Sequence, residues 1–180
     1  MTRSQTLTIY AVLIIIIGLL VVSMSYIPSE AIQYSVGFGM LICTIFSGIT
    51  SYKCRFLNIP FAYHLLHSIG YAVYGIVILF YAISSENFLH VTSFFLLYYA
   101  ISEIIFNFQI AMLKRDNINF QTMIYRSIIG LFIAVGSFIV ITISTTNQRE
   151  ALLASGVVFI FSGINLLLFR TVIKDLVVPI

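Results

Sequence analysis

Two ionisable residues stand inside apolar stretches of the sequence, where a charge is costly. Glu103 lies in the run Ala-Ile-Ser-Glu-Ile-Ile-Phe, and Arg126 lies in the run Met-Ile-Tyr-Arg-Ser-Ile-Ile. An ionisable group within a membrane-spanning helix costs about 2.5–3.5 kcal/mol on insertion scales, so it usually faces the protein interior and finds a partner. Glu103 lies 13 residues before Asp116, and Arg126 lies 10 residues after it. With a turn near Asp116 and a rise of about 1.5 Å per residue, the two depths differ by about 5 Å, which predicts a Glu103–Arg126 ion pair.

Three roles are open for this predicted pair. The first is an interhelical lock with no transport role, because buried ion pairs can serve packing specificity alone. The second is a proton- or ion-coupled site, because intramembrane ionisable residues mark such pathways. The third is that one of the two side chains extends to the membrane interface instead of pairing.

Histidines and amides add a second group of polar residues. His64 and His67 are three residues apart, which places them roughly on one helix face, and Asn107 and Gln109 fall at a similar depth on another helix. Together they predict a polar cluster towards the cytoplasmic leaflet, where acid would charge a histidine that titrates near pH 6.5. Alternatively, the two histidines donate to neighbouring helices or lie in the headgroup layer. His90 is expected at the interface.

The sequence lacks the residue patterns of catalysis and cofactor binding. It has no Ser-His-Asp arrangement, His-Glu-x-x-His motif, phosphate-binding glycine loop or nucleotide fingerprint, and no long basic patch for nucleic acid. Only two histidines cluster and no third ligand has suitable spacing, so no metal site is expected. Cys43 and Cys54 are expected to be reduced thiols. We therefore expect a protein that is not an enzyme and has no cofactor.

The elements that position these side chains must be helices in a lipid bilayer. Of 180 residues, 61% are hydrophobic and 8% are charged, and the mean hydropathy is +1.09. A soluble domain carries roughly 25% charged residues, so this chain cannot cover itself with a wetted surface. Residues 11–22 lack the apolar–polar alternation of a barrel strand. The sequence predicts an all-α polytopic membrane protein that forms one domain over residues 1–180.

Six apolar stretches of about 20 residues define the predicted membrane spans. Short links make consecutive helices antiparallel neighbours. Glu30, Glu86 and Glu150 begin alternate spans, where an acid meets the positive end of the helix dipole; alternatively, these three acids form a ring at the outer mouth. The predicted spans are about 7–27, 30–52, 61–84, 88–113, 119–142 and 150–173.

The basic residues predict the orientation in the membrane. Arg149 is the one basic residue in the loops of the opposite side. Under the positive-inside rule, the basic side is cytoplasmic, so both termini are expected inside the cell. Seven basic residues share the predicted cytoplasmic side: Arg3, Lys53, Arg55, Lys114, Arg115, Arg170 and Lys174.

Tyrosines divide into two predicted sets. Those near helix ends are expected in interfacial belts, and the deeper ones are expected to face the bundle because their hydroxyls need partners. The interfacial set is Tyr10, Tyr26, Tyr52, Tyr63, Tyr81 and Tyr125, and the deeper set is Tyr71, Tyr74, Tyr98 and Tyr99.

The sequence also contains a threefold repeat, over about 7–55, 61–115 and 119–174, which predicts three antiparallel hairpins. The first helix of each hairpin carries a glycine in an apolar setting, and the second carries a Ser-x-Ile step. Small residues let helices approach closely in lipid, so these glycines are predicted packing positions. They are Gly18, Gly75 and Gly130 in the first helices, and Gly48 and Gly163 in the steps Ser47-Gly48-Ile49 and Ser162-Gly163-Ile164; Ser102-Glu103-Ile104 is the middle step.

Three glycine-bearing hairpins in about 180 residues resemble the HdeD-like acid-resistance membrane proteins, a family built from a short membrane repeat. The resemblance covers nearly the whole chain and implies a bacterial inner-membrane protein linked to acid stress. It carries over no catalytic residue. The middle hairpin departs from the repeat, because Glu103 stands where the other two have glycine.

Two functions follow as expectations. The first is a non-catalytic stress protein that acts by its presence in the bilayer or by binding a partner. The second is a small proton- or ion-coupled transporter or channel with a polar site near Glu103 and Arg126. A homo-oligomer is a further possibility, with Gly37 and Gly39 pairing across chains. The substrate and the partner protein are unknown.

Overall fold

The computed structural model describes residues 2–27, 29–81, 84–112 and 118–172. Each helix in these residues is long and apolar enough to cross a membrane, by its length and composition. The predicted all-α fold with six such helices is confirmed. The helices are α1 (Arg3–Met24), α2 (Glu30–Lys53), α3 (Asn58–Phe80), α4 (Ser85–Ala111), α5 (Phe120–Ile143) and α6 (Gln148–Val172).

Several helices begin earlier than the apolar stretches that predict them. α1 begins at Arg3 because Thr2 and Gln5 form a capping box: the Thr2 hydroxyl accepts from the Gln5 backbone N–H, and the Gln5 side chain accepts from the Thr2 backbone N–H. α3 begins at Asn58 and ends at Phe80, a few residues before both predicted limits. The polar first turn of α1 is part of the helix because its cap satisfies backbone donors, whereas Leu57 before α3 forms no side-chain cap.

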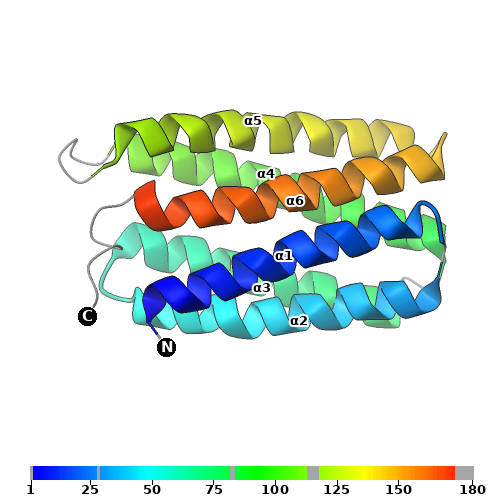
Figure 1. The fold of residues 1–180 in the computed structure, drawn as a ribbon, viewed down its shortest axis with the longest axis horizontal. Coiled ribbons are helices and arrows are strands. Elements are labelled where there is room, and N and C mark those ends of the chain that lie inside the picture. The colour runs from blue at the N-terminus through cyan, green and yellow to red at the C-terminus, as the bar shows by residue number, and fades with distance from the viewer. Residues whose placement is uncertain (1, 28, 82–83, 113–117, 173–180) are drawn as a thin grey trace.

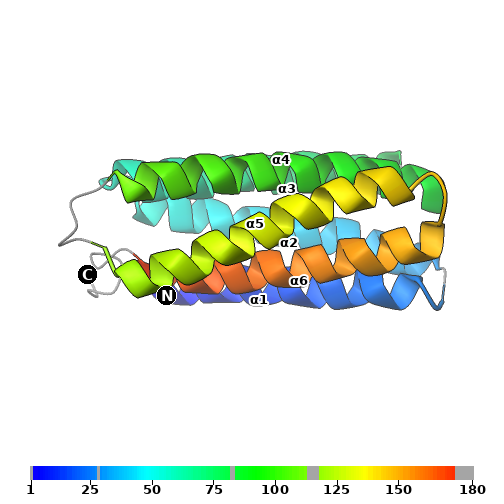
Figure 2. The same ribbon diagram turned by 90° about the horizontal axis from the view of Figure 1, so that it is seen from above.

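The six helices form a closed ring (Figures 1 and 2). Consecutive helices pack against each other, and α1 packs against α6, so that the first helix of the chain meets the last. α6 also contacts α4. The threefold hairpin repeat stays a prediction.

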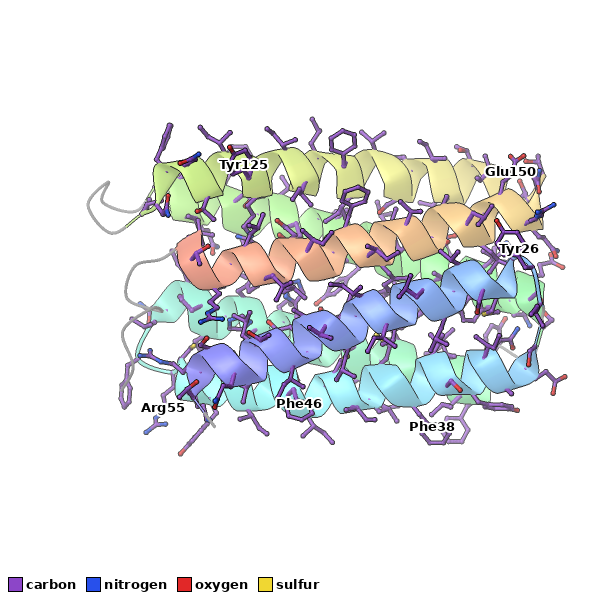
Figure 3. All side chains as sticks on the ribbon, in the orientation of Figure 1. Tyr26, Phe38, Phe46, Arg55, Tyr125 and Glu150 are labelled. Atoms are coloured by element: carbon purple, nitrogen blue, oxygen red, sulfur yellow. The ribbon has the colours of Figure 1, made fainter. Side chains whose placement is uncertain are left out.

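The outer surface of the ring is apolar along the helices, and two charged side chains lie inside the ring. Phe38 and Phe94 are 59% and 71% exposed, whereas Glu103 and Arg126 are fully buried. Figure 3 shows Phe38 pointing away from the bundle. A water-soluble protein has the opposite distribution of charged side chains. Lipid is therefore the solvent that fits this surface.

The two ends of the bundle carry different residues. α1 begins with Arg3, and α6 ends near Arg170 at the same end of the bundle. Figure 3 places Arg55 at this end and Glu150 at the other, next to Arg149. Lys114, Arg115 and Lys174 lie outside the described residues.

Packing along α1 and α6 depends on small residues. A Cβ atom at Gly163 would lie 2.7 Å from the Ala11 carbonyl oxygen, and one at Gly18 would lie 2.7 Å from the Gly156 carbonyl oxygen. Such contacts leave no room for a side chain, so the two backbones approach as small-residue helix pairs do in lipid. The other predicted glycines also face neighbouring helices: Gly75 meets Gly37, Gly130 meets Asn107, and Gly48 meets Ser68.

Gly37 and Gly39, the positions predicted to pair across chains, face helices of the same chain, and the homo-oligomer stays a prediction. Gly37 packs against Leu79 of α3, and Gly39 packs against Ile17 of α1. Both glycines therefore serve contacts within the bundle.

Candidate functional site

Glu103 and Arg126 form the predicted ion pair. The Arg126 Nη2 atom lies 2.6 Å from Glu103 Oε2, and both side chains are fully buried. The pair joins α4 to α5, as the depth argument expects. Its formation inside the bundle excludes the alternative in which one of the two side chains extends to the interface.

Three further side chains converge on the Glu103 carboxylate. Asn165 of α6 donates from Nδ2 to Oε2 over 2.6 Å, and Tyr63 of α3 donates its hydroxyl to Oε1 over 2.5 Å. His67 Nε2 lies 3.6 Å from Oε1. Both carboxylate oxygens are thus engaged, and the site unites α3, α4, α5 and α6. Hydrogen bonds to a buried charge stabilise it where water is absent.

The Arg126 guanidinium also lies against two aromatic rings. Its Cζ atom is 4.9 Å from the centre of the Tyr63 ring and 4.7 Å from the centre of the Phe169 ring. These two rings stack on each other with centroids 4.3 Å apart. Cations are attracted to aromatic faces, so the rings provide part of the solvation that the buried guanidinium loses.

The two predicted histidines are buried and belong to the same cluster. His64 Nδ1 lies 2.5 Å from the Tyr10 hydroxyl of α1. His67 Nε2 lies 3.2 Å from the Ser102 hydroxyl, and the His67 ring stacks on Tyr99. The alternative in which both histidines bond to neighbouring helices therefore describes their contacts, and neither lies in the headgroup layer. His90 is exposed near the start of α4, as expected for an interfacial residue.

Gln109 departs from the predicted cluster, whereas Asn107 contributes a buried amide oxygen to it. Asn107 is half-buried and its amide faces Gly130 of α5, where a Cβ would lie 3.0 Å from Asn107 Nδ2. Gln109 is exposed. Depth alone placed these residues with the histidines, but the helical rotation of α4 turns Gln109 away from the bundle interior.

Tyr10 and Tyr63 contradict their predicted interfacial place. Both are fully buried and bond to His64 and Glu103. A tyrosine near a helix end has the same sequence context whether it faces lipid headgroups or the core, so the sequence carried no signal for this difference. The remaining predicted interfacial tyrosines are 52–66% exposed: Tyr26, Tyr52, Tyr81 and Tyr125. Of the deeper set, Tyr71, Tyr74 and Tyr99 are buried and Tyr98 is partly buried.

Asn165 is the functional residue that the sequence interpretation missed. It lies two residues after Gly163 in the Ser-Gly-Ile-Asn segment of α6. A polar amide within an apolar span was the available signal, because such a group costs free energy unless it finds a partner.

Several polar atoms around the ion pair have no hydrogen-bond partner among the described residues. Buried polar groups are normally paired, and each exception calls for an explanation such as a water or an ion. The unpaired atoms of His64, His67, Asn165 and Arg126 belong to the cluster around Glu103. The atoms without a partner are His64 Nε2, His67 Nδ1, Tyr71 Oη, Asn107 Oδ1, Asn165 Oδ1, and Arg126 Nε and Nη1.

The cluster contains acids, bases and hydroxyls that exchange protons, rather than a set of metal ligands. Among the described residues, no group of three or more His, Cys, Asp or Glu side chains could hold a metal ion. Cys43 and Cys54 are buried free thiols. No protein-family model matches the sequence, and no curated protein or solved structure matches it either.

Proposed function

We propose that this protein is a non-catalytic, multi-pass protein of the bacterial inner membrane that responds to acid through the site around Glu103. The observation that carries the proposal is the position of Glu103. It is a fully buried carboxylate on which polar side chains from three other helices converge. The resemblance to HdeD-like proteins supports an acid-stress setting.

Proton binding at Glu103 would change the packing of the helices. The carboxylate balances the charge of Arg126 and accepts a hydrogen bond from Asn165. A protonated Glu103 no longer balances that charge, and an unpaired charge inside a protein is strongly destabilising. Protonation therefore weakens the contact of α4 with α5 and α6. The protein then acts by its altered presence in the bilayer or by binding a partner.

We further propose that both termini are cytoplasmic. Arg3, Lys53, Arg55 and Arg170 belong to the end of the bundle at which α1 begins and α6 finishes, and Arg149 belongs to the other. Lysine and arginine are enriched on the cytoplasmic side of membrane proteins. The site around Glu103 then lies nearer to the cytoplasm.

A small proton- or ion-coupled transporter is the second candidate. The unpartnered atoms of His64, His67, Tyr71 and Arg126 favour it, because a pure interhelical lock has no need of them. They provide sites at which a moving proton or a water molecule can be held between Glu103 and its surroundings.

Glu103→Gln tests both candidates, with the exposed residue change Glu86→Gln as control. In the proposed function, Glu103→Gln imitates the protonated carboxyl at every pH and so alters acid survival in cells, and the wild-type protein in liposomes passes no protons. In the transporter, wild-type liposomes pass protons and Glu103→Gln stops the flux. If the variant leaves both survival and flux unchanged, the ion pair is only a lock and both candidates fail.

A further inference from the structure

Along α1 and α2, most of the buried polar side chains lie on one side of Glu103. Nearer the end with Arg3, α1 buries Thr6 and Tyr10. Further along, it buries only apolar side chains and Gly18. α2 runs in the opposite direction, and its last turns are also the richer in buried polar side chains, although its first turn buries Gln33. Its last turns bury Ser47, Thr50 and Ser51, and its middle buries Val36, Met40 and Cys43.

The polar side chains of α1 have partners that lead inwards from that end. A cavity of about 10 Å³ lies among Arg3, Thr50 and Cys54 at the end of the bundle, a volume near the smallest that holds one water molecule. Thr50 donates to the Thr6 hydroxyl over 2.9 Å. Tyr10 follows Thr6 by one helical turn, and residues four apart on a helix are neighbours.

Tyr10 connects this polar series to the site. Its hydroxyl lies 2.5 Å from His64 Nδ1, and His64 Nε2 has no partner among the described residues. Other groups that face His64 are the ring of Tyr63, the ring of Phe169, the side chain of His67 and the charge of Arg126. His64 is thus a bridge between Tyr10 of α1 and the polar groups around Glu103.

We propose that protons reach Glu103 from the end of the bundle that carries Arg3 and Arg170, and that Tyr10 and His64 pass them on. This inference rests on the proposed role of Glu103 as a proton-binding group. It adds the direction from which protons come and the residues that conduct them.

The transfer keeps its proton balance at every atom. With Tyr10 as the donor, neutral His64 carries its proton on Nε2. Tyr10 gives its hydroxyl proton to His64 Nδ1 and regains one from a water molecule on the side of Thr6, which takes its replacement proton from the solvent at that end of the bundle. The imidazolium releases the Nε2 proton to a water molecule on the inner side, which delivers it to the Glu103 carboxylate. The rotation of the His64 ring exchanges its two nitrogens and so returns the ring to its first state.

The opposite half of the bundle supplies a matched control. Tyr74 of α3 and Thr92 of α4 form a buried hydroxyl pair of 2.8 Å, similar to the Tyr10–His64 contact. This pair lies on the far side of Glu103, towards the end where α4 begins. Removal of the Tyr74 hydroxyl therefore disturbs the core to a similar extent without touching the proposed route.

Hydrogen exchange in liposomes tests the route independently of any proton flux. The full chain, labelled with ¹⁵N at histidine, is transferred into D₂O, and solid-state NMR follows the loss of the Nε2–H signal of His64, assigned by its absence from His64→Gln. Tyr10→Phe is expected to slow this exchange about tenfold, the ratio that corresponds to one lost hydrogen bond, and Tyr74→Phe to leave it unchanged. Thr50→Val serves if Tyr10→Phe fails to fold, with slower exchange again expected.

Two results overturn the proposal: unchanged exchange in Tyr10→Phe, or slower exchange in Tyr74→Phe alone, which would place the route at the other end. Failure of the proposed function has a different result, namely unchanged acid survival and proton flux in Glu103→Gln. If Glu103→Gln loses its response while Tyr10→Phe exchanges normally, the function stands and the route is wrong.

Discussion

Glu103 of α4 and Arg126 of α5 form an ion pair, with Arg126 Nη2 2.6 Å from Glu103 Oε2. Neither side chain is exposed to solvent. An ion pair in such surroundings is worth less than its short distance suggests, because both charges have lost their hydration. Its importance is clearest when one partner is removed, since the other charge then stays buried without compensation. This asymmetry gives the first prediction.

Glu103→Gln is expected to lower the free energy of unfolding by about 3–5 kcal/mol, because it leaves the Arg126 charge unpaired. The double variant Glu103→Gln, Arg126→Met should recover much of this loss, because it removes both charges. Unfolding by SDS in mixed micelles, followed by circular dichroism, measures both changes. If the loss of stability in the double variant equals the sum of the losses in Glu103→Gln and in Arg126→Met alone, the two residues are not directly coupled.

Asn165→Leu is expected to cost about 1.5–3 kcal/mol, the usual contribution of a hydrogen bond to a charged group. Its Nδ2 atom donates to the same carboxylate oxygen as Arg126. Asn58→Leu at the exposed start of α3 is the control, and its stability should be nearly that of the wild type. The same SDS titration reports both values, and equal stabilities of the two variants would refute the role given to Asn165.

Gly163→Ala is expected to destabilise the contact of α1 with α6 by about 1–3 kcal/mol, the cost of overpacking. The new Cβ would lie 2.7 Å from the Ala11 carbonyl oxygen, which belongs to the backbone and cannot move alone. Gly48→Ala is the matched control, because its Cβ would meet only the Ser68 hydroxyl, at 3.3 Å. Comparable losses in the two variants would show that the α1–α6 contact is looser than described.

Alkylation of Cys54 is expected to begin at a higher pH than alkylation of a free cysteine. Burial raises the pKa of the Cys54 thiol, and the neighbouring Arg3 lowers that pKa to a smaller extent. The thiolate is the reactive form, and a raised pKa means that it forms only as the pH rises further. The rate of reaction of Cys54 with N-ethylmaleimide is measured against pH in the Cys43→Ala variant. The reference is a triple variant, Cys43→Ala, Cys54→Ala and Phe56→Cys, whose one cysteine replaces a side chain that is 81% exposed. Identical pH profiles would contradict the buried position of Cys54.

Reporter fusions at the two ends of the chain are expected to locate both in the cytoplasm. An even number of crossings places the ends on one face of the membrane, and the basic residues select the cytoplasmic face. A reporter between α5 and α6, near Arg149, should be found outside. Reporters at the two ends that lie on opposite faces would require an odd number of crossings.

The sequence by itself determined the helices and the ion pair. Each span is a long apolar run, and in hydrocarbon only a helix pairs the backbone groups of such a run internally. Glu103 and Arg126 stood out because a charge within a span needs a partner, and the short link between their helices fixed their relative depth. The packing glycines were recognisable for a similar reason, since lipid gives helices little drive to associate except close contact.

Only the tertiary structure decided which polar residues complete the site. Short links constrain neighbours in the chain, whereas Asn165 of α6 reaches Glu103 of α4, and Tyr10 of α1 reaches His64 of α3, from helices that are not consecutive. Their arrival depends on the closure of the ring by α1 and α6 and on the rotation of each helix about its axis. Neither quantity is encoded in any local stretch, because both result from the packing of all six helices at once.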